Sequence, residues 1–462
     1  MVAVWLLFLF SVNVEGFFFF PEIEKFYLPG DADAGISLYL TPLLEEGKYE
    51  KAQQLSRVKP DLGNITSYSG FFTINKHCQS NLFFWFFPAQ NGQWKDAPLL
   101  LWLEGGPGLT SLYSILLNIG PLKYHEGKLQ KQEFSWNLET NLLLIDQPVG
   151  TGYSFTKSGC YAKNETDVGE DLYKALIQFY QLFPELVKNN FFISGQSYAG
   201  HYIPALGHAI HKYNPGAEVK ISLAAMMIGN GLSDAETQLD YGNHLYYLGL
   251  IDDAARDVYN QNYKQFVQNI KNKNWNAASK ISYAFRGFLY DKFVGRKVDF
   301  FNYIDGSSIS LDNLTRYIQS AEFRKALQIG YLPFNSFKNV YRNLRNDIVQ
   351  SVKPWVEELL EFYPIVFYNG QLDLTCAYPL TINFLCSLDW SGKEQYLNSN
   401  RTKWCVKDNL AGYYKGGHNL YDVLVRDAGH AVTNDQPLLA LTLISSVTSG
   451  TPDNPLHALT PC

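Results

Sequence analysis

Short apolar runs alternate with amphipathic segments along most of the chain. Six of these runs are bounded by turn-forming or charged residues, at residues 82–89, 98–106, 141–150, 189–195, 221–231 and 364–370. Apolar runs of this length between turn residues are typical of buried strands. We therefore predict a strand in each of them.

Helical spacing appears between the runs. Residues 167–183, "DVGEDLYKALIQFYQLF", place leucines and aromatic residues on one face of a helix. Further helical segments are predicted at residues 37–58, 197–213 and 435–447. Strands that alternate with helices favour the α/β class, with a mostly parallel central sheet and helices on both faces.

The stretch from residue 232 to residue 355 breaks this alternation. It is rich in Asn, Lys, Tyr and helix-forming residues and contains no clear apolar strand. We interpret it as a helical cap inserted between two strands of the sheet. The predicted division is a signal peptide at 1–16, an N-terminal arm and helix at 17–67, an α/β core at 68–231, the cap at 232–355 and the second part of the core at 356–462.

The N-terminus favours the secretory route. The apolar run at residues 2–10 is too short to span a bilayer and suits a signal peptide that ends at Gly16, with a membrane anchor as the alternative. Four Asn-x-Thr sequons follow, at Asn64, Asn164, Asn313 and Asn400. We therefore predict a glycoprotein that is secreted or resides in the lysosomal or endosomal lumen.

The chain has six cysteines, at Cys78, Cys160, Cys376, Cys386, Cys405 and Cys462. None of them forms a C-x-x-C pair, which argues against a zinc or redox site. An even number in an oxidising compartment predicts disulfides, and proximity in the sequence alone suggests Cys386 with Cys405. The histidines show no metal-ligand spacing, so we predict no metal site.

Charge and composition exclude some partners. The formal net charge of −6 argues against nucleic acid or an anionic membrane surface as a partner. A hydrophobic content of 46% is ample for a large packed core. The aromatic residues therefore belong to this core and to pocket walls rather than to a platform for stacking bases.

A candidate nucleophile follows the run at 189–195. The sequence "FFISGQSYAG" places Ser197 between a strand and a helix, the setting of a nucleophile elbow, although the second glycine of the usual G-x-S-x-G pattern is displaced to Gly200. A serine needs a histidine base that a carboxylate orients. Asp373 and His430 follow later strand candidates in the chain order that α/β hydrolases use, so we predict a triad of the three.

An acyl-enzyme also needs backbone N–H groups that stabilise an oxyanion. The glycine-rich turn in "WLEGGPGLTS" follows an earlier strand, which is the place where such folds put these groups. The same residues form ordinary turns in any protein. The glycine-rich turn alone therefore does not distinguish an oxyanion site from an ordinary turn.

Together these segments resemble the serine carboxypeptidases, and among them the vitellogenic and vitellogenic-like branch. The resemblance runs from about residue 68 to residue 441 through "SNLFFWFFPAQ", "LLLWLEGGPG", "FSWNLETNLLLIDQPVGTGYSF", "FFISGQSYAGHYIPAL", "IGNGLSD", "VFYNGQLD" and "AGHAVTNDQP". It implies an α/β-hydrolase fold with a helical cap and no metal or cofactor. It also implies that Ser197 is the nucleophile, His430 the base and Asp373 its orienting carboxylate, with the oxyanion held by the N–H groups of Gly106 and Tyr198.

The chain departs from that family where the family binds the C-terminal carboxylate of its substrate. The family uses an Asn before the glycine turn, the next Gly and two Glu side chains. Here the Asn position holds Glu104, the two Glu positions hold Asn118 and Gln196, and only Gly105 is kept. The amides of Asn118 and Gln196 can still donate hydrogen bonds, whereas an ionised Glu104 would repel a carboxylate.

The sequence therefore predicts a secreted serine-type carboxypeptidase that releases C-terminal amino acids from peptides through an acyl-enzyme. Two alternatives remain at this stage. The altered subsite could serve an esterase, amidase or acyltransferase of the same fold, or the protein could be an inactive secreted binding protein.

Overall fold

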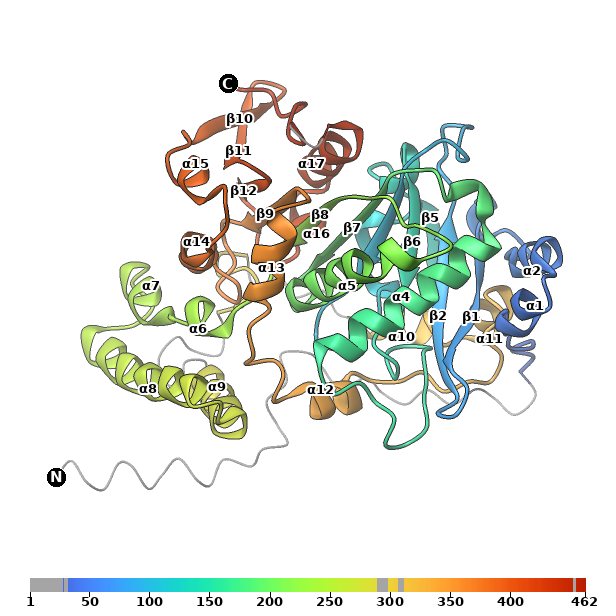
Figure 1. Ribbon diagram of the computed structural model, residues 1–462, viewed down its shortest axis with the longest axis horizontal. Coiled ribbons are helices and arrows are strands. Elements are labelled where there is room, and N and C mark those ends of the chain that lie inside the picture. The colour runs from blue at the N-terminus through green and yellow to red at the C-terminus, as the bar shows by residue number, and fades with distance from the viewer. Residues whose placement is uncertain (1–27, 29–31, 289–297, 306–310, 452–453) are drawn as a thin grey trace.

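The computed structural model describes residues 28, 32–288, 298–305, 311–451 and 454–462, which are the coloured parts of Figure 1. The predicted signal peptide, residues 1–16, lies outside the described residues.

A ten-stranded sheet forms the centre of the molecule and runs across Figure 1 from β1 to β10. In spatial order its strands are β1 (Tyr68–Asn75), β2 (Ser80–Phe87), β6 (Asn141–Ile145), β3 (Leu99–Leu103), β7 (Phe191–Gln196), β8 (Leu223–Gly229), β9 (Ile365–Gly370), β12 (Leu420–Val425), β11 (Asn409–Gly417) and β10 (Thr402–Val406). The six strands from β6 to β12 are parallel, and two antiparallel strands flank them on each side. All six predicted strands are confirmed, and so is the mostly parallel sheet.

Both faces of the sheet are buried, which explains why its strands appear as continuous apolar runs. In β2, Phe84 and Phe86 enter one hydrophobic core and Phe83 and Trp85 enter the other, because side chains alternate along a strand.

The first core is covered by helices α1 (Thr41–Glu45), α2 (Tyr49–Ser56), α4 (Glu165–Leu182), α5 (Ala199–Tyr213), α13 (Lys353–Leu360), α14 (Tyr378–Ser387) and α15 (Lys393–Leu397). The second is covered by α3 (Leu112–Ser114), α10 (Asp312–Ile318), α11 (Ala321–Ala326), α16 (Val432–Asp435) and α17 (Pro437–Ser449). A separate hairpin joins β4 (Leu122–His125) to β5 (Lys128–Lys131). Helices therefore cover both faces, as an α/β hydrolase requires.

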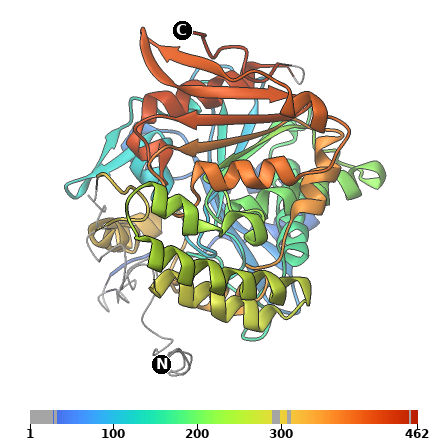
Figure 2. The same cartoon turned by 90° about the vertical axis from the view of Figure 1, so that its left-hand side faces the viewer.

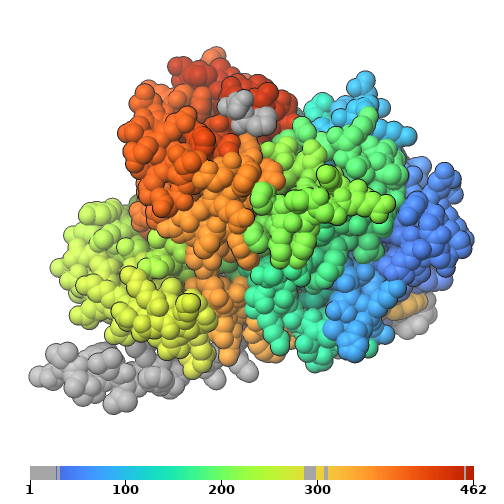
Figure 3. Space-filling view, viewed as in Figure 1, coloured from blue at the N-terminus to red at the C-terminus, as the bar shows by residue number. Residues whose placement is uncertain are grey.

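The chain between β8 and β9 is helical, and its described residues add no strand to the sheet. Besides α10, α11 and α13 it contains α6 (Ala235–Gln238), α7 (Tyr241–Tyr247), α8 (Asp253–Lys271), α9 (Trp275–Phe288) and α12 (Lys338–Leu344). Figure 2 shows α8 and α9 side by side at one end of the molecule, and in Figure 3 the same yellow-green segment forms a lobe beside the body. Since α10 and α11 return to the second core, only part of this insertion stands over the end of the sheet. The boundaries of the division at 232 and 355 stay a prediction.

The disulfides join Cys78 to Cys160 and Cys405 to Cys462. The predicted pair of Cys386 with Cys405 is wrong, because the C-terminal tail lies along β10. The backbone N–H of Cys405 donates to the carbonyl of Thr460 at 2.9 Å, which brings Cys462 to Cys405. Cys376 and Cys386 take part in neither disulfide.

No helix in the described ranges combines the length and the apolar character that crossing a membrane requires.

Candidate active site

Ser197 occupies a sharp turn between β7 and α5. Its φ of +63° lies in the left-handed region, which is rare for a residue other than glycine and is typical of a nucleophile elbow. Its backbone N–H donates to the carbonyl of Gly229 at 2.9 Å, and its own carbonyl accepts from Gly200 and Leu232, both at 3.0 Å. Backbone hydrogen bonds therefore hold the turn and leave the hydroxyl unengaged by the fold.

Close packing explains the displaced glycine of the motif. A Cβ on Gly200 would lie 2.6 Å from the carbonyl oxygen of Leu232, so this position needs a glycine. A Cβ on Gly195 would lie 2.3 Å from the carbonyl oxygen of Leu103. Ala199 occupies the position of the second glycine in the usual G-x-S-x-G pattern, and its methyl group is small.

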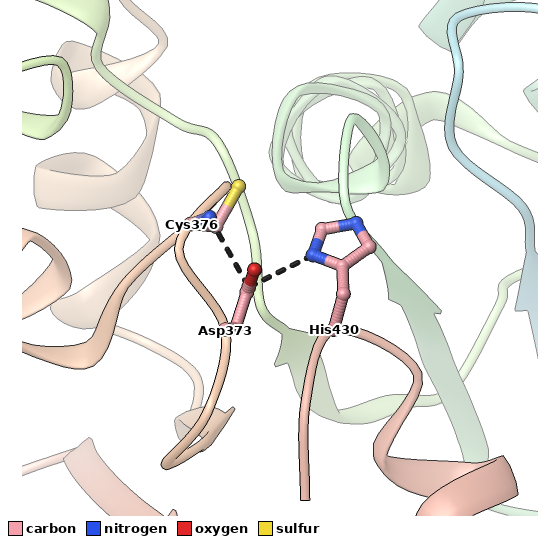
Figure 4. A group of neighbouring side chains, drawn as sticks. All are labelled: Asp373, Cys376 and His430. Carbon is pink, nitrogen blue, oxygen red and sulfur yellow. Dashed lines mark hydrogen bonds and ion pairs between the residues drawn. The ribbon is translucent and has the colours of Figure 1, made fainter. Parts of the chain in front are cut away.

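Asp373 and His430 meet at the same edge of the sheet. Asp373 follows β9 and His430 follows β12, and carboxyl ends of neighbouring parallel strands lie together. The Nδ1 of His430 lies 2.8 Å from Oδ2 of Asp373, and both residues are buried (Figure 4). Asp373 and His430 are therefore hydrogen-bonded as the sequence predicts.

Three further donors fix the carboxylate of Asp373. Asn230 donates from its side-chain amide to Oδ2 at 2.6 Å, and the N–H groups of Thr375 and Cys376 donate to Oδ1 and Oδ2 at 2.7 and 3.1 Å. Asn230 directly follows β8, and sequence reasoning did not select it. The Asn-Gly pair after an apolar run was the signal available in the sequence.

The other ring nitrogen of His430, Nε2, is buried and makes no hydrogen bond with any described residue. The ring stacks on Phe301 with centroids 4.8 Å apart, and the His430 N–H donates to the Phe301 carbonyl at 2.6 Å. No hydrogen bond joins Ser197 to His430 here, and such contacts often tighten only when substrate binds. Nε2 is therefore available to accept a proton.

A pocket beside the elbow brings the nucleophile and the two oxyanion candidates together. Gly106, Ser197 and Tyr198 all line it. The glycine turn lies directly on the elbow, because a Cβ on Gly105 would be 2.6 Å from the nitrogen of Tyr198. Within the described chain, neither Gly106 nor Tyr198 donates its N–H in a backbone hydrogen bond.

The replaced subsite residues only partly come together. Glu104 is buried, and its Oε1 accepts from the Gln196 amide at 2.9 Å and from the Gly105 N–H at 3.1 Å. The hydroxyl of Ser114 donates to Oε2. Burial raises the pKa of Glu104, and the hydrogen bonds from Ser114 and Gln196 oppose that rise. Glu104 is thus a paired carboxyl group with an increased tendency to be neutral.

Asn118 lies one turn after Ser114, on the π-helical turn Ile115–Ile119. Its side chain is buried, and its Oδ1 has no hydrogen-bond partner among the described residues. Among the described residues, no direct hydrogen bond therefore links Asn118 to Glu104, Gly105 or Gln196.

Three side chains with metal-ligating atoms meet at this edge. In the described part of the chain, Asp373, Cys376 and His430 form the group whose ligating atoms lie within 4.8 Å of one another. The facing atoms of Asp373 and His430 are already bonded to each other. These two residues are therefore engaged with each other.

Two more carboxyl groups, those of Asp146 and Asp347, are buried. Asp146 accepts from Thr110 Oγ1 at 2.7 Å and from the N–H groups of Ser111 and Tyr153, both at 3.1 Å, and so holds the end of the glycine turn. Burial raises the pKa of Asp146 to about 7, and these hydrogen bonds oppose the rise. Burial also raises the pKa of Asp347 to about 7.

These two groups predict that the protein is more stable in acid. Each pKa is raised above its ordinary value of 3.8, so the folded state binds the proton more tightly than the unfolded chain does. Their contribution to stability is complete below the ordinary pKa and is lost as the pH rises through the folded value near 7. The melting temperature should therefore be several degrees higher at about pH 5 than at about pH 8.

Replacing Asp347 by Asn should reduce this difference, whereas the exposed Asp408→Asn should leave it unchanged. A thermal unfolding series across this pH range checks both variants. An unchanged pH dependence in Asp347→Asn would contradict the assignment.

The family comparison agrees with this geometry. A family model described as serine carboxypeptidase matches residues 59–450. The chain belongs to the serine carboxypeptidase family. This carboxypeptidase is 43% identical to the venom serine carboxypeptidase of Apis mellifera, an alignment that covers 96% of this chain and 98% of the relative. The resemblance inferred from the sequence is therefore confirmed.

Two further relatives place the carboxypeptidase in the same branch. It is 41% identical to the vitellogenic carboxypeptidase of Aedes aegypti, with 91% of each chain covered. It is 39% identical to the probable serine carboxypeptidase CPVL of Homo sapiens, with 90% of each covered. The enzyme class is thus that of a serine carboxypeptidase, whose substrates are peptides.

The fold has a solved counterpart. The Kex1 carboxypeptidase of Saccharomyces cerevisiae superimposes with a TM-score of 0.75 at 24% identity, and the match covers 85% of this chain and 95% of that one. This likeness confirms the α/β-hydrolase fold.

Proposed function

We propose that the protein removes C-terminal amino acids from peptides through an acyl-enzyme on Ser197. The observation that carries this proposal is the bond of 2.8 Å between His430 and Asp373, which leaves Nε2 of His430 available as a base. The elbow and the glycine turn supply a nucleophile and two N–H groups at one pocket. These are the parts that acyl transfer needs.

The steps follow from these groups. The Ser197 hydroxyl oxygen attacks the last peptide carbonyl while its proton passes to Nε2 of His430. The N–H groups of Gly106 and Tyr198 stabilise the oxyanion, and Asp373 stabilises the imidazolium. The C–N bond then breaks as His430 returns the proton to the leaving amine, which departs as a free amino acid. Water attacks the acyl-enzyme by the same route and releases the shortened peptide.

We infer that the substrate carboxylate is bound at Glu104, Gly105, Asn118 and Gln196, with Glu104 neutral. The hydrogen bonds around Glu104 support this inference. A carboxyl group that is buried and hydrogen-bonded to Gln196 and Ser114 does not face the substrate as an exposed anion. A neutral carboxyl group and the amides can all donate hydrogen bonds to a carboxylate.

This inference predicts that activity on free-acid peptides declines as the pH rises through the raised pKa of Glu104. Once Glu104 ionises, it repels the substrate carboxylate by ~4 kcal/mol for a separation of ~4 Å and an effective dielectric of ~20. Glu104→Gln should remove this decline from the pH profile of kcat/KM, whereas the exposed Glu133→Gln should retain it. An identical decline in Glu104→Gln would rule out Glu104 as its source.

A second function is favoured by one observation, the carboxyl side chain of Glu104 at a position where the family has an amide. If Glu104 is ionised at working pH, the site prefers amides, esters or amines to free acids. Cleavage of a blocked dipeptide and of its C-terminally amidated twin separates the two functions. If Ser197 contributes to neither reaction, the protein acts as a binding protein.

We also propose that the protein works in the secretory route, outside the cell or in the lysosomal or endosomal lumen. The two disulfides suit an oxidising compartment. The four sequon asparagines are all exposed, as attached glycans require: Asn64, Asn164, Asn313 and Asn400. A loss of mass on treatment with a glycosidase specific for N-linked glycans, absent when all four sequons are changed to Gln, tests the glycosylation.

A further inference from the structure

Among the described residues that line the pocket beside the elbow, one side chain is charged. It is lined by Gly106, Pro107, Ser197, Tyr198, Leu232, Ser279, Ser282, Tyr283, Phe301, Phe337, Tyr341, Arg345, Ile348, Val349, Thr375 and Cys376. These residues include no Asp, Glu or Lys. Within the described lining, Arg345 therefore supplies a positive charge, in a protein whose overall charge is −6.

The pocket lies between the helical insertion and the elbow. Ser279, Ser282 and Tyr283 belong to α9 and form one wall, while the chain from Phe337 to Val349 forms another. In Figure 3 orange surface, the colour of α12 and α13, separates the yellow-green lobe from the green body. Because Ser197 also lines this space, a side chain next to the attacked carbonyl reaches the pocket directly.

This pocket is separate from the subsite for the C-terminal carboxylate. None of Glu104, Gly105, Asn118 and Gln196 belongs to its lining. A peptide bound for cleavage places its last residue on one side of the scissile bond and its penultimate residue, which supplies the carbonyl, on the other. With the last residue at the subsite, the penultimate side chain faces the pocket.

Arg345 is available to a ligand. It lies directly after α12, is exposed, and has neither an ion pair nor a ring contact among the described residues. By contrast, Arg57 pairs with Asp61 and Arg256 with Asp257. The nearest carboxyl group along the chain, Asp347, is buried and accepts from the side chain of Gln350 at 3.2 Å.

We propose that Arg345 is a specificity-determining residue that selects peptides with an acidic penultimate residue. The guanidinium presents paired N–H donors that match a carboxylate, and the hydroxyl groups of Ser279 and Ser282 on α9 line the same pocket. This inference rests on the proposed function, since it assumes that the acyl part of the substrate is bound at Ser197.

The test compares three blocked dipeptides that share their last residue and carry Glu, Gln or Lys before it. At about pH 6 and low salt, kcat/KM should be about tenfold higher for Glu than for Gln, the size of one hydrogen bond to a charged group, and lowest for Lys. Arg345→Gln should make Glu and Gln equal, and Arg345→Glu should favour Lys. Arg345→Lys should keep part of the preference.

Arg342→Gln is the matched control, because Arg342 is exposed on α12 and lies outside the pocket lining. It should retain the full preference for Glu.

Equal rates for Glu and Gln in the unchanged enzyme would overturn the proposal, as would a preference that survives Arg345→Gln. An equal loss for all three peptides in Arg345→Gln would also overturn it, because Arg345 would then bind the C-terminal carboxylate. If the unchanged enzyme releases no amino acid from any peptide, the proposed function fails and this inference fails with it.

Discussion

Replacing Ser197 by Ala is expected to lower kcat for amino-acid release by about 10⁶-fold. Without the hydroxyl, no acyl-enzyme forms, and His430 has no proton to accept. The fold should survive, because the turn is held by backbone bonds to Gly229, Gly200 and Leu232, all of which alanine keeps. Steady-state release from a blocked dipeptide measures the loss, and the melting temperature checks the fold.

Ser194→Ala is a matched control for this variant. Ser194 is a fully buried serine on β7, three residues before the nucleophile. It should keep kcat within about threefold, as a substitution away from the reacting atoms does. If Ser197→Ala retained more than about one hundredth of the activity with a normal fold, Ser197 would not be the nucleophile.

Replacing Asp373 by Asn is expected to lower kcat by about 10⁴-fold with little change in KM. The carboxylate keeps the proton of neutral His430 on Nδ1, so that Nε2 presents its lone pair to Ser197. The oxygens of Asp373 already accept from Asn230, Thr375 and Cys376. With its oxygen at the Oδ1 position, where Thr375 donates, an asparagine would place its NH₂ group at the Oδ2 position, opposite Nδ1 of His430, and would force the proton onto Nε2.

The kcat and KM of Asp373→Asn distinguish this role from general destabilisation. A loss confined to kcat, in a variant that unfolds at the usual temperature, is the expected outcome. A fall of less than about tenfold would show that the carboxylate does not set the tautomer of His430.

The parallel part of the sheet was predictable because each of its strands is buried on both faces. Such strands appear in the sequence as uninterrupted apolar runs, as β3 and β6 do. The antiparallel strands β10 and β11 were missed for the opposite reason. β11, Asn409–Gly417, contains three glycines and is only partly buried, so it lacks the apolar signal of a strand.

The disulfides depended on tertiary contacts. Cys405 and Cys462 are 57 residues apart, and only the placement of the tail along β10 brings them together. Distance along the chain therefore gave the wrong partner.

Ser197, Asp373 and His430 could be selected from the sequence because each follows a recognisable strand, and parallel strands end at one edge of the sheet. Their role as a triad stays a prediction. Asn230 also follows such a strand, but its role requires knowing that its amide faces Asp373. Arg345 belongs to no motif at all. It reaches the pocket only because the helical insertion folds back over the elbow. The local sequence does not predict this path of the chain.

The most direct test of the account follows release of the last amino acid from a blocked dipeptide and from its amidated twin, between about pH 4 and pH 8, with Ser197→Ala beside the unchanged enzyme. The unchanged enzyme should cleave the free acid much faster than the amide, with the advantage greatest at acidic pH, and Ser197→Ala should cleave neither. Equal or faster cleavage of the amide, or release that does not depend on Ser197, would contradict a serine carboxypeptidase that binds its substrate through the terminal carboxylate.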